Sequence, residues 1–278
     1  MNDLTGLVLS QKYKLTKIIS KGTFCKLYEA LHIDKNIKVA IKVESSDTGK
    51  KILENEINIY LYLNKSKSKG KSKSNSNSKN INIPNIKYIG VYQEYKYIVM
   101  ELLDKNLKDY LIHHNETNDF MNVTYDIIYT IYNFHERNLV HRDIKPENFI
   151  FDNKNNIYII DFGLSAFFSN RQLSSFIGNK LYASYNSHLS HYVYKPTDDL
   201  ISIIYMLFHL YSGILPWLDQ NPNLYYNLKY STNYVEYYKS IKKYDIVIQN
   251  LTQIYEQIHT TKYYENIFAY LNQVIKYC

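Results

Sequence analysis

The chain has 278 residues, of which 45% are hydrophobic and 21% are charged, and this balance excludes a wholly disordered protein. Its two cysteines exclude a secreted disulfide scaffold and favour an intracellular compartment, the cytoplasm or the nucleus. The formal net charge is +7, but six lysines and no acidic residue lie in residues 64–80, so the rest of the chain is nearly neutral.

The N-terminal part of the chain has the pattern of short strands. Apolar spacing over residues 50–63 predicts one helix among them. The Lys-, Ser- and Asn-rich residues 64–80 bury nothing, so we expect a disordered insert there. Its lysines could contact nucleic acid, but no aromatic side chains are interleaved for base stacking, which favours a solvated loop. Segments rich in Ile, Val, Leu and Tyr predict strands at residues 13–20, 26–32, 38–44, 86–90 and 95–101.

Beyond residue 103 the pattern becomes helical. Apolar residues share one helix face over residues 120–134, and residues 149–151 and 157–160 flank a hairpin turn. The longest apolar stretch, residues 200–217, contains Ser, His, Gly and Pro, so we expect a buried core helix, not a membrane span. The order of elements predicts an α+β fold with two lobes and a hinge at residues 101–104.

Three short motifs follow one another along the chain. VAIK ends at Lys42 on a predicted strand, HRDIKPEN runs from His141 to Asn148 in a predicted loop, and DFG begins at Asp161. They match the kinase signatures VAIK, HRDxxxxN and DFG. A lysine that holds the α- and β-phosphates of ATP needs an acidic partner on the next helix, and Glu54 and Glu56 are the candidates. We select Glu56, because Tyr60 then lies one turn later and faces the core.

The other two motifs carry the remaining chemistry of phosphoryl transfer. Asp143 would accept or orient the proton of the substrate hydroxyl, and Lys145 can reach the γ-phosphate. Asn148 and Asp161 offer the oxygen ligands that Mg²⁺ prefers, with Mn²⁺ as an alternative. A lysine at position 145 is typical of serine/threonine kinases. The phosphate-covering loop keeps one glycine, Gly22. The small residues Ser20 and Cys25 stand at the positions of the first and third glycines.

Over residues 10–275, apart from the insert, the chain resembles protein kinases of the casein kinase I group. The resemblance rests on MELL at residues 100–103, YASYNSHL at 182–189, DDL at 198–200 and LPW at 215–217. It implies a bilobal protein-kinase fold, with an N-lobe over about residues 10–101 and a C-lobe over about residues 104–278. It also implies ATP and Mg²⁺ as cofactors, protein substrates that include the chain itself, and a monomer.

The resemblance also implies how the nucleotide is held. Met100 corresponds to the gatekeeper, and the adenine would bond to the backbone at Glu101 and Leu103. Asp199 would begin the buried helix and brace the catalytic loop. The remaining contacts implied for the nucleotide come from Ser20, Gly22, Cys25, Leu27, Ala40 and Lys42.

The chain departs from the group at two positions. Asn179 replaces a threonine that supports the catalytic aspartate, and Leu181 replaces an arginine linked with acidic substrates. Together with the poor glycine loop, Asn179 motivates an alternative, a pseudokinase or nucleotide-binding scaffold, whereas Leu181 puts the substrate preference of the group in doubt. Bias towards Asn, Ile, Lys and Tyr is typical of an AT-rich genome, such as that of a large virus or a protist.

Four serines follow the DFG motif. They could be autophosphorylated, or they could simply lie in a solvated loop. They are Ser165, Ser169, Ser174 and Ser175.

Overall fold

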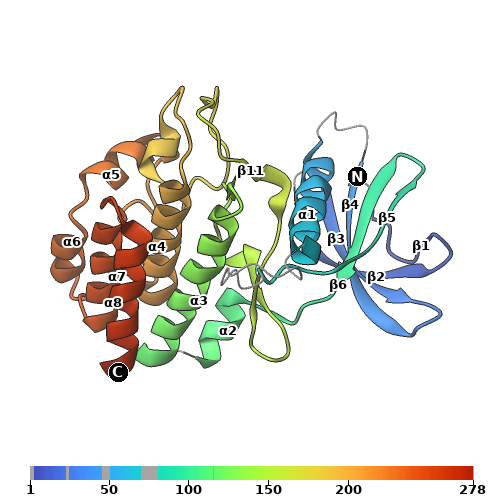
Figure 1. Ribbon diagram of the computed structural model, residues 1–278, viewed down its shortest axis with the longest axis horizontal. Coiled ribbons are helices and arrows are strands. Elements are labelled where there is room, and N and C mark those ends of the chain that lie inside the picture. The colour runs from blue at the N-terminus through green and yellow to red at the C-terminus, as the bar shows by residue number, and fades with distance from the viewer. Residues whose placement is uncertain (1–2, 23–24, 46–50, 70–80, 115, 278) are drawn as a thin grey trace. The chain divides into compact units, whose positions relative to one another are not determined.

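An antiparallel sheet forms most of the N-terminal part of the protein (Figure 1). The computed structural model describes residues 3–22, 25–45, 51–69, 81–114 and 116–277. The strand order in the sheet is β1-β2-β3-β4-β6-β5, and each predicted strand is present with small shifts at its ends. The strands are β1 (Val8–Leu9), β2 (Tyr13–Lys21), β3 (Cys25–His32), β4 (Ile37–Ser45), β5 (Ile86–Tyr92) and β6 (Tyr95–Glu101).

The sheet is held by one cluster of apolar side chains. Alternate residues of a strand point to opposite faces, so each strand contributes every second residue to this cluster. Fully buried members from the middle strands include Tyr28, Val39, Ile41 and Val99. The alternation leaves Lys42, next to Ile41, on the opposite face from this cluster.

Helix α1 (Ile52–Lys69) begins where the sequence predicts a helix but ends later. It buries Leu53, Tyr60 and Leu63, and then continues through residues that we expected to be a solvated loop. Lysine is a good helix former, so a helix anchored by these apolar residues can extend beyond the last of them. Residues 70–80, the rest of the expected insert, lie outside the described residues.

Helices make up most of the C-terminal part. Helix α4 contains the first part of the longest apolar stretch, as far as Ser212, and Leu200 to Phe208 are buried there, as the core-helix interpretation predicts. Gly213 ends this helix with φ of +73°, a conformation that glycine adopts without strain. No helix in the described ranges is long and apolar enough to cross a membrane. The helices are α2 (Leu107–His113), α3 (Thr117–His135), α4 (Pro196–Ser212), α5 (Tyr225–Ser231), α6 (Tyr234–Ser240), α7 (Ile246–Gln257) and α8 (Tyr263–Tyr277).

Short elements connect the helices. Strand β8 pairs antiparallel with β11, and in the predicted hairpin turn the Asp152 amide donates to the Asn156 carbonyl at 3.0 Å. The short strands are β7 (Lys105–Asn106), β8 (Leu139–Val140), β9 (Phe149–Phe151), β10 (Ile157–Ile159) and β11 (Ala166–Phe167). The 3-10 helices are η2 (Pro146–Asn148), η3 (Phe162–Leu164), η4 (Tyr185–His188) and η5 (Pro222–Leu224).

The chain divides into two compact units. The first unit comprises Met1–Asp104 together with Phe151–Leu164, and the second comprises Lys105–Ile150 together with Ser165–Cys278. The first boundary lies at the end of the expected hinge. The segment Phe151–Leu164 belongs to the first unit, although the sequence analysis assigned it to the C-lobe.

Two buried tyrosines allow a matched test of side-chain hydroxyls. Among the described residues, no hydrogen-bond partner lies near the Tyr60 hydroxyl, whereas the Tyr97 hydroxyl bonds to Ser10 Oγ at 2.6 Å. We expect Tyr60→Phe to raise the free energy of unfolding by about 1 kcal/mol and Tyr97→Phe to lower it by a similar amount. Urea unfolding of both variants checks this, and equal losses would contradict it.

Candidate active site

Three charged side chains meet in the first unit. Lys42 lies in the middle of β4, paired with Leu27 on one neighbouring strand and Ile98 on the other. Its Nζ donates to Glu56 Oε2 at 2.6 Å and to Asp161 Oδ1 at 2.8 Å. A strand, a helix and the DFG segment therefore bring one cation and two carboxylates together.

Burial and charge act on this cluster in opposite directions. Burial alone would lower the pKa of Lys42, but the carboxylates of Glu56 and Asp161 raise it overall. Burial raises the pKa of Glu56 to about 7, against the attraction of Lys42. Lys42 is consequently an ammonium at neutral pH, held in place by its two partners.

The structure places Glu56, and not Glu54, beside Lys42. Glu54 projects from the same helix towards Lys96, with its Oε2 2.8 Å from the Lys96 Nζ. Both side chains of that pair are about two-fifths exposed, whereas the Glu56 side chain is 2% exposed. The two glutamates thus differ in partner and in burial, and only Glu56 can orient Lys42.

The DFG segment is anchored to α1. The Asn55 Nδ2 donates to the carbonyls of Phe162 at 3.2 Å and Gly163 at 3.0 Å. The Phe162 ring is buried edge-on against Tyr60, with ring centroids 4.8 Å apart. A Cβ on Gly163 would lie 2.4 Å from the Ile52 side chain, so close contact with the helix requires glycine here. These contacts fix the two residues that directly follow Asp161.

The glycine-poor loop is partly defined. Ser20 pairs with Leu27 across β2 and β3, and the Gly22 amide donates to the Cys25 carbonyl at 2.9 Å. Cys25 is buried, and its Sγ lies 3.8 Å from Glu44 Oε1. Burial raises the pKa of the Cys25 thiol to about 12. The thiol is therefore a packed side chain and not an activated nucleophile.

The predicted adenine contacts lie at the end of β6. Ala40 and Met100 are buried and directly paired in the sheet. The Glu101 amide donates to the Asn85 carbonyl at 3.2 Å, while its carboxylate accepts from the Asn85 amide. Leu103 lies two residues after β6 and directly before Asp104, the last residue of this segment of the first unit. All the residues predicted to contact the nucleotide thus belong to the first unit.

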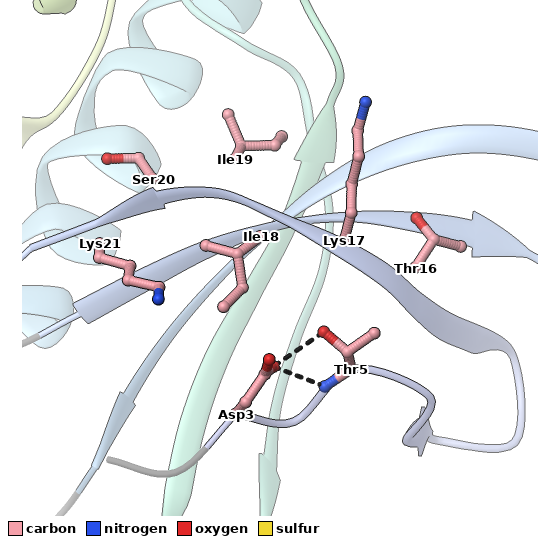
Figure 2. A pocket seen from close by; sticks show the side chains of 8 residues that line it. All are labelled: Asp3, Thr5, Thr16, Lys17, Ile18, Ile19, Ser20 and Lys21. Carbon is pink, nitrogen blue, oxygen red and sulfur yellow. Dashed lines mark hydrogen bonds between the residues drawn. The ribbon is translucent and has the colours of Figure 1, made fainter.

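A shallow hollow beside β2 is separate from this set. It is lined by Asp3, Thr5 and residues 16–21, most of them exposed (Figure 2). The Asp3 carboxylate accepts from the Thr5 amide at 2.9 Å and from its hydroxyl at 2.8 Å. Only Ser20 is shared with the predicted nucleotide contacts, and the hollow contains no buried charge that would mark a binding site.

The second unit holds the other three predicted residues close together. Lys145 Nζ donates to Asp143 Oδ2 at 2.6 Å, and Asn148 Nδ2 donates to the Asp143 carbonyl at 2.7 Å. Since the amide nitrogen of Asn148 is used in this way, its Oδ1 is left as the oxygen that could accept a cation. Carboxylate and amide oxygens are ligands that suit Mg²⁺, so Asn148 and Asp161 fit the predicted metal by their chemistry.

The backbone before Asp143 is held by a buried carboxylate. Asp199, in the first turn of α4, accepts from the His141 amide at 2.7 Å and from the Arg142 amide at 3.0 Å. It also accepts from His135 Nε2 at 2.9 Å and from the Tyr194 hydroxyl at 2.8 Å. Asp199 thus braces the catalytic loop, as expected. Sequence reasoning missed His135 and Tyr194, because no motif connects them to the loop.

A strained turn accompanies this brace. Arg142 has φ of +68°, an uncommon conformation for a residue with a side chain. A Cβ on Gly178 would lie 2.2 Å from the Arg142 carbonyl oxygen, and Gly178 itself has φ of +104°. Only glycine can meet both conditions, so Gly178 closes the segment after DFG directly onto the catalytic loop.

The next segment, residues 179–188, is held by a buried lysine. Lys229 is 1% exposed, and its Nζ donates to the carbonyls of Lys180 at 2.8 Å and Ala183 at 2.6 Å. It also lies 5.1 Å from the centroid of the Trp217 ring. Burial lowers the pKa of Lys229 to about 6. Sequence analysis missed Lys229, because nothing in its local pattern separates it from a surface lysine.

Two residues that follow the DFG motif, Ser165 and Asn179, differ from their expected roles. Asn179 Oδ1 accepts from the amides of Leu181 at 2.9 Å and Tyr182 at 3.3 Å, so it caps a turn in its own segment. Ser165 is 1% exposed, and its hydroxyl donates to the His141 carbonyl at 3.2 Å. Burial makes Ser165 unsuitable as the exposed phosphorylation site considered above.

Comparisons with known proteins relate the chain to one family. Residues 13–266 match the protein kinase domain family. The chain is 31% identical, over 228 residues, to a "probable serine/threonine-protein kinase" of Dictyostelium discoideum, and the match covers 76% of this chain and 43% of that protein. The solved structure of vaccinia related kinase 3 is similar in fold, with a TM-score of 0.73 at 20% identity, over 98% of this chain and 90% of that one. The chain belongs to the protein kinase domain family.

Proposed function

We propose that the protein is a serine/threonine protein kinase that transfers the γ-phosphate of ATP to hydroxyls of protein substrates. The observation that carries the proposal is the Lys42 ammonium held between Glu56 and Asp161 at 2.6 and 2.8 Å. A cation fixed in this way suits the α- and β-phosphates of ATP. The curated relative is named as a kinase of the same class, and this chain spans 43% of its length.

The residues of the second unit supply the chemistry at the hydroxyl. In the proposed reaction the substrate oxygen forms a bond to the γ-phosphorus, and the bond from that phosphorus to the β,γ-bridging oxygen breaks. Asp143 takes the hydroxyl proton, and ADP leaves. Lys145, 2.6 Å from Asp143, balances the negative charge near the transferred group.

The metal assignment is part of the same proposal. Asn148 would hold a divalent cation through Oδ1, and Asp161 through its carboxylate. Mg²⁺ bound there, or Mn²⁺ in its place, would neutralise charge that develops on the phosphates. Asn148 is kept in this orientation by its bond to the Asp143 carbonyl.

The nearer relationship is to the casein kinase I group. The motifs at residues 100–103, 182–189 and 215–217 support it, and so does Lys145. The described residues retain every predicted member of the catalytic set, so the scaffold alternative gains no support from them. We further propose a monomer that acts in the cytoplasm or nucleus, with its own exposed serines among the substrates.

Loss of either charged centre should abolish transfer. With ³²P-labelled ATP and Mg²⁺, we expect label on serine or threonine of casein or of the protein itself. Lys42→Met and Asp143→Asn should each reduce that label at least about a hundredfold. Phosphoamino acid analysis identifies the acceptor, and a nucleotide thermal-shift measurement controls for folding. Equal signals from wild type and Asp143→Asn would refute kinase activity.

The two glutamates of α1 provide a matched pair. Glu56→Gln removes the charge that orients Lys42, and transfer should fall about tenfold to a hundredfold. Glu54→Gln removes a partly exposed partner of Lys96 and Lys51, and transfer should equal wild type. Initial rates at saturating ATP check both variants. A similar fall in the two would show that the Lys42 pair has no special role.

The buried thiol predicts a pH dependence. Only the thiolate reacts with iodoacetamide, and burial raises the Cys25 pKa from 9.0 to about 12. In a Cys278→Ser variant at pH 8, native alkylation should be about a thousandfold slower than in denaturant. The rate should then rise about tenfold for each pH unit up to pH 10. Fast native labelling at pH 8 would show that Cys25 is an open, activated thiol.

A further inference from the structure

A hydrogen-bond chain leads from the C-terminal helix to the catalytic loop. The Tyr264 hydroxyl, near the start of α8, bonds to Nδ1 of His135, the last residue of α3. The other ring nitrogen of His135 bonds to Asp199 at 2.9 Å. Asp199 in turn holds the amides of His141 and Arg142. The chain thus ends at the residue directly before Asp143.

The hydrogen-bond partners in the chain suit one arrangement of its protons. Burial would raise the pKa of Asp199, but its hydrogen bonds, from His135 above all, lower it overall, so the group is a carboxylate. A carboxylate only accepts hydrogen bonds, and His135 must therefore carry a proton on Nε2. Burial raises the pKa of Tyr264, whose phenol stays protonated and can donate to Nδ1. Donation by Tyr264 favours the tautomer that Asp199 needs.

Aromatic packing holds the tyrosine in place. Its ring meets Tyr132 edge-on at 4.8 Å, and Tyr132 lies one turn before His135 on α3. On α8 the ring stacks on Phe268 at 6.0 Å. Figure 1 shows α3 and α8 running beside each other in the second unit. Packing between α3 and α8 thus holds the Tyr264 hydroxyl next to His135.

We propose that Tyr264 is a positioning residue, whose hydroxyl keeps His135 in the form that binds Asp199 and thereby sets the backbone beside Asp143. The consequence for phosphoryl transfer rests on the proposed function. The consequence for the loop does not, because the amides of His141 and Arg142 report on it directly. The paired tyrosines of residues 263–264 have no local pattern that reveals this role.

Tyr264→Phe removes the hydroxyl and keeps the ring. We expect hydrogen exchange of the His141 and Arg142 amides to become about threefold to tenfold faster, the effect of losing one hydrogen bond. In protein labelled with ¹⁵N-histidine, the Nδ1 resonance of His135 should shift. The kcat for transfer should fall by a similar factor, with the KM for ATP unchanged. Tyr263→Phe, in the adjacent ring, is the control and should match wild type in all three measurements.

His135→Gln gives a second, independent variant. It keeps a donor for Asp199 but removes the ring nitrogen that meets Tyr264, so Tyr264→Phe should add nothing in this background. If Tyr264→Phe does not fold, hydrogen exchange of the His141 and Arg142 amides in His135→Gln tests whether loss of the contact between Tyr264 and His135 loosens the loop.

Three results would overturn the proposal. These are unchanged exchange in Tyr264→Phe, faster exchange with an unchanged His135 spectrum, and equal effects of Tyr263→Phe. Faster exchange with unchanged kcat would overturn the catalytic part. Absence of transfer in wild type would instead refute the proposed function, and exchange and the histidine spectrum would still decide whether Tyr264 positions the loop.

Discussion

A carboxylate with no access to water must be surrounded by hydrogen-bond donors, and Asp199 meets this requirement with four. Two of the donors are backbone amides of the catalytic loop. The need to satisfy the buried charge therefore also fixes the irregular backbone that carries Asp143. The strained turn at Arg142 persists because Asp199 holds its amide and Gly178 packs against its carbonyl.

In the first unit the charge that must find partners is positive, not negative. Lys42 is a largely buried cation that needs carboxylates, and it brings together a strand, a helix and the DFG segment. Since each partner comes from a different element, a movement of α1 or of Asp161 would leave a buried charge without its full set of partners. The cluster thus links the position of Glu56 to that of the DFG segment. The contacts of Asn55 and Tyr60 strengthen the same link through backbone and ring.

Sequence reasoning succeeded where a motif or a period carries the information. The strands follow from short segments rich in Ile, Val, Leu and Tyr, and Glu56 was separated from Glu54 because helical spacing places Tyr60 one turn later. It failed where the partner is distant in sequence and has no pattern of its own. His135 lies 64 residues from Asp199, and Lys229 lies 46 residues from the Ala183 carbonyl. The burial of Ser165 could not be predicted either, because the composition of its segment is that of a polar loop.

Residues 179–188 form an irregular segment whose backbone polar groups are paired by nearby side chains. An irregular backbone must find partners for its own polar groups. Here Lys229 satisfies two carbonyls, the Trp217 indole donates to the Leu181 carbonyl at 2.9 Å, and Asn179 accepts from two amides. Neither Asn179 nor Leu181 is the residue expected from the family resemblance, yet the segment is closed by contacts from α5 and from its own turn. Asn179 contributes a cap within its segment, so its departure from threonine does not by itself imply a lost catalytic loop, which Asp199 holds from the other side.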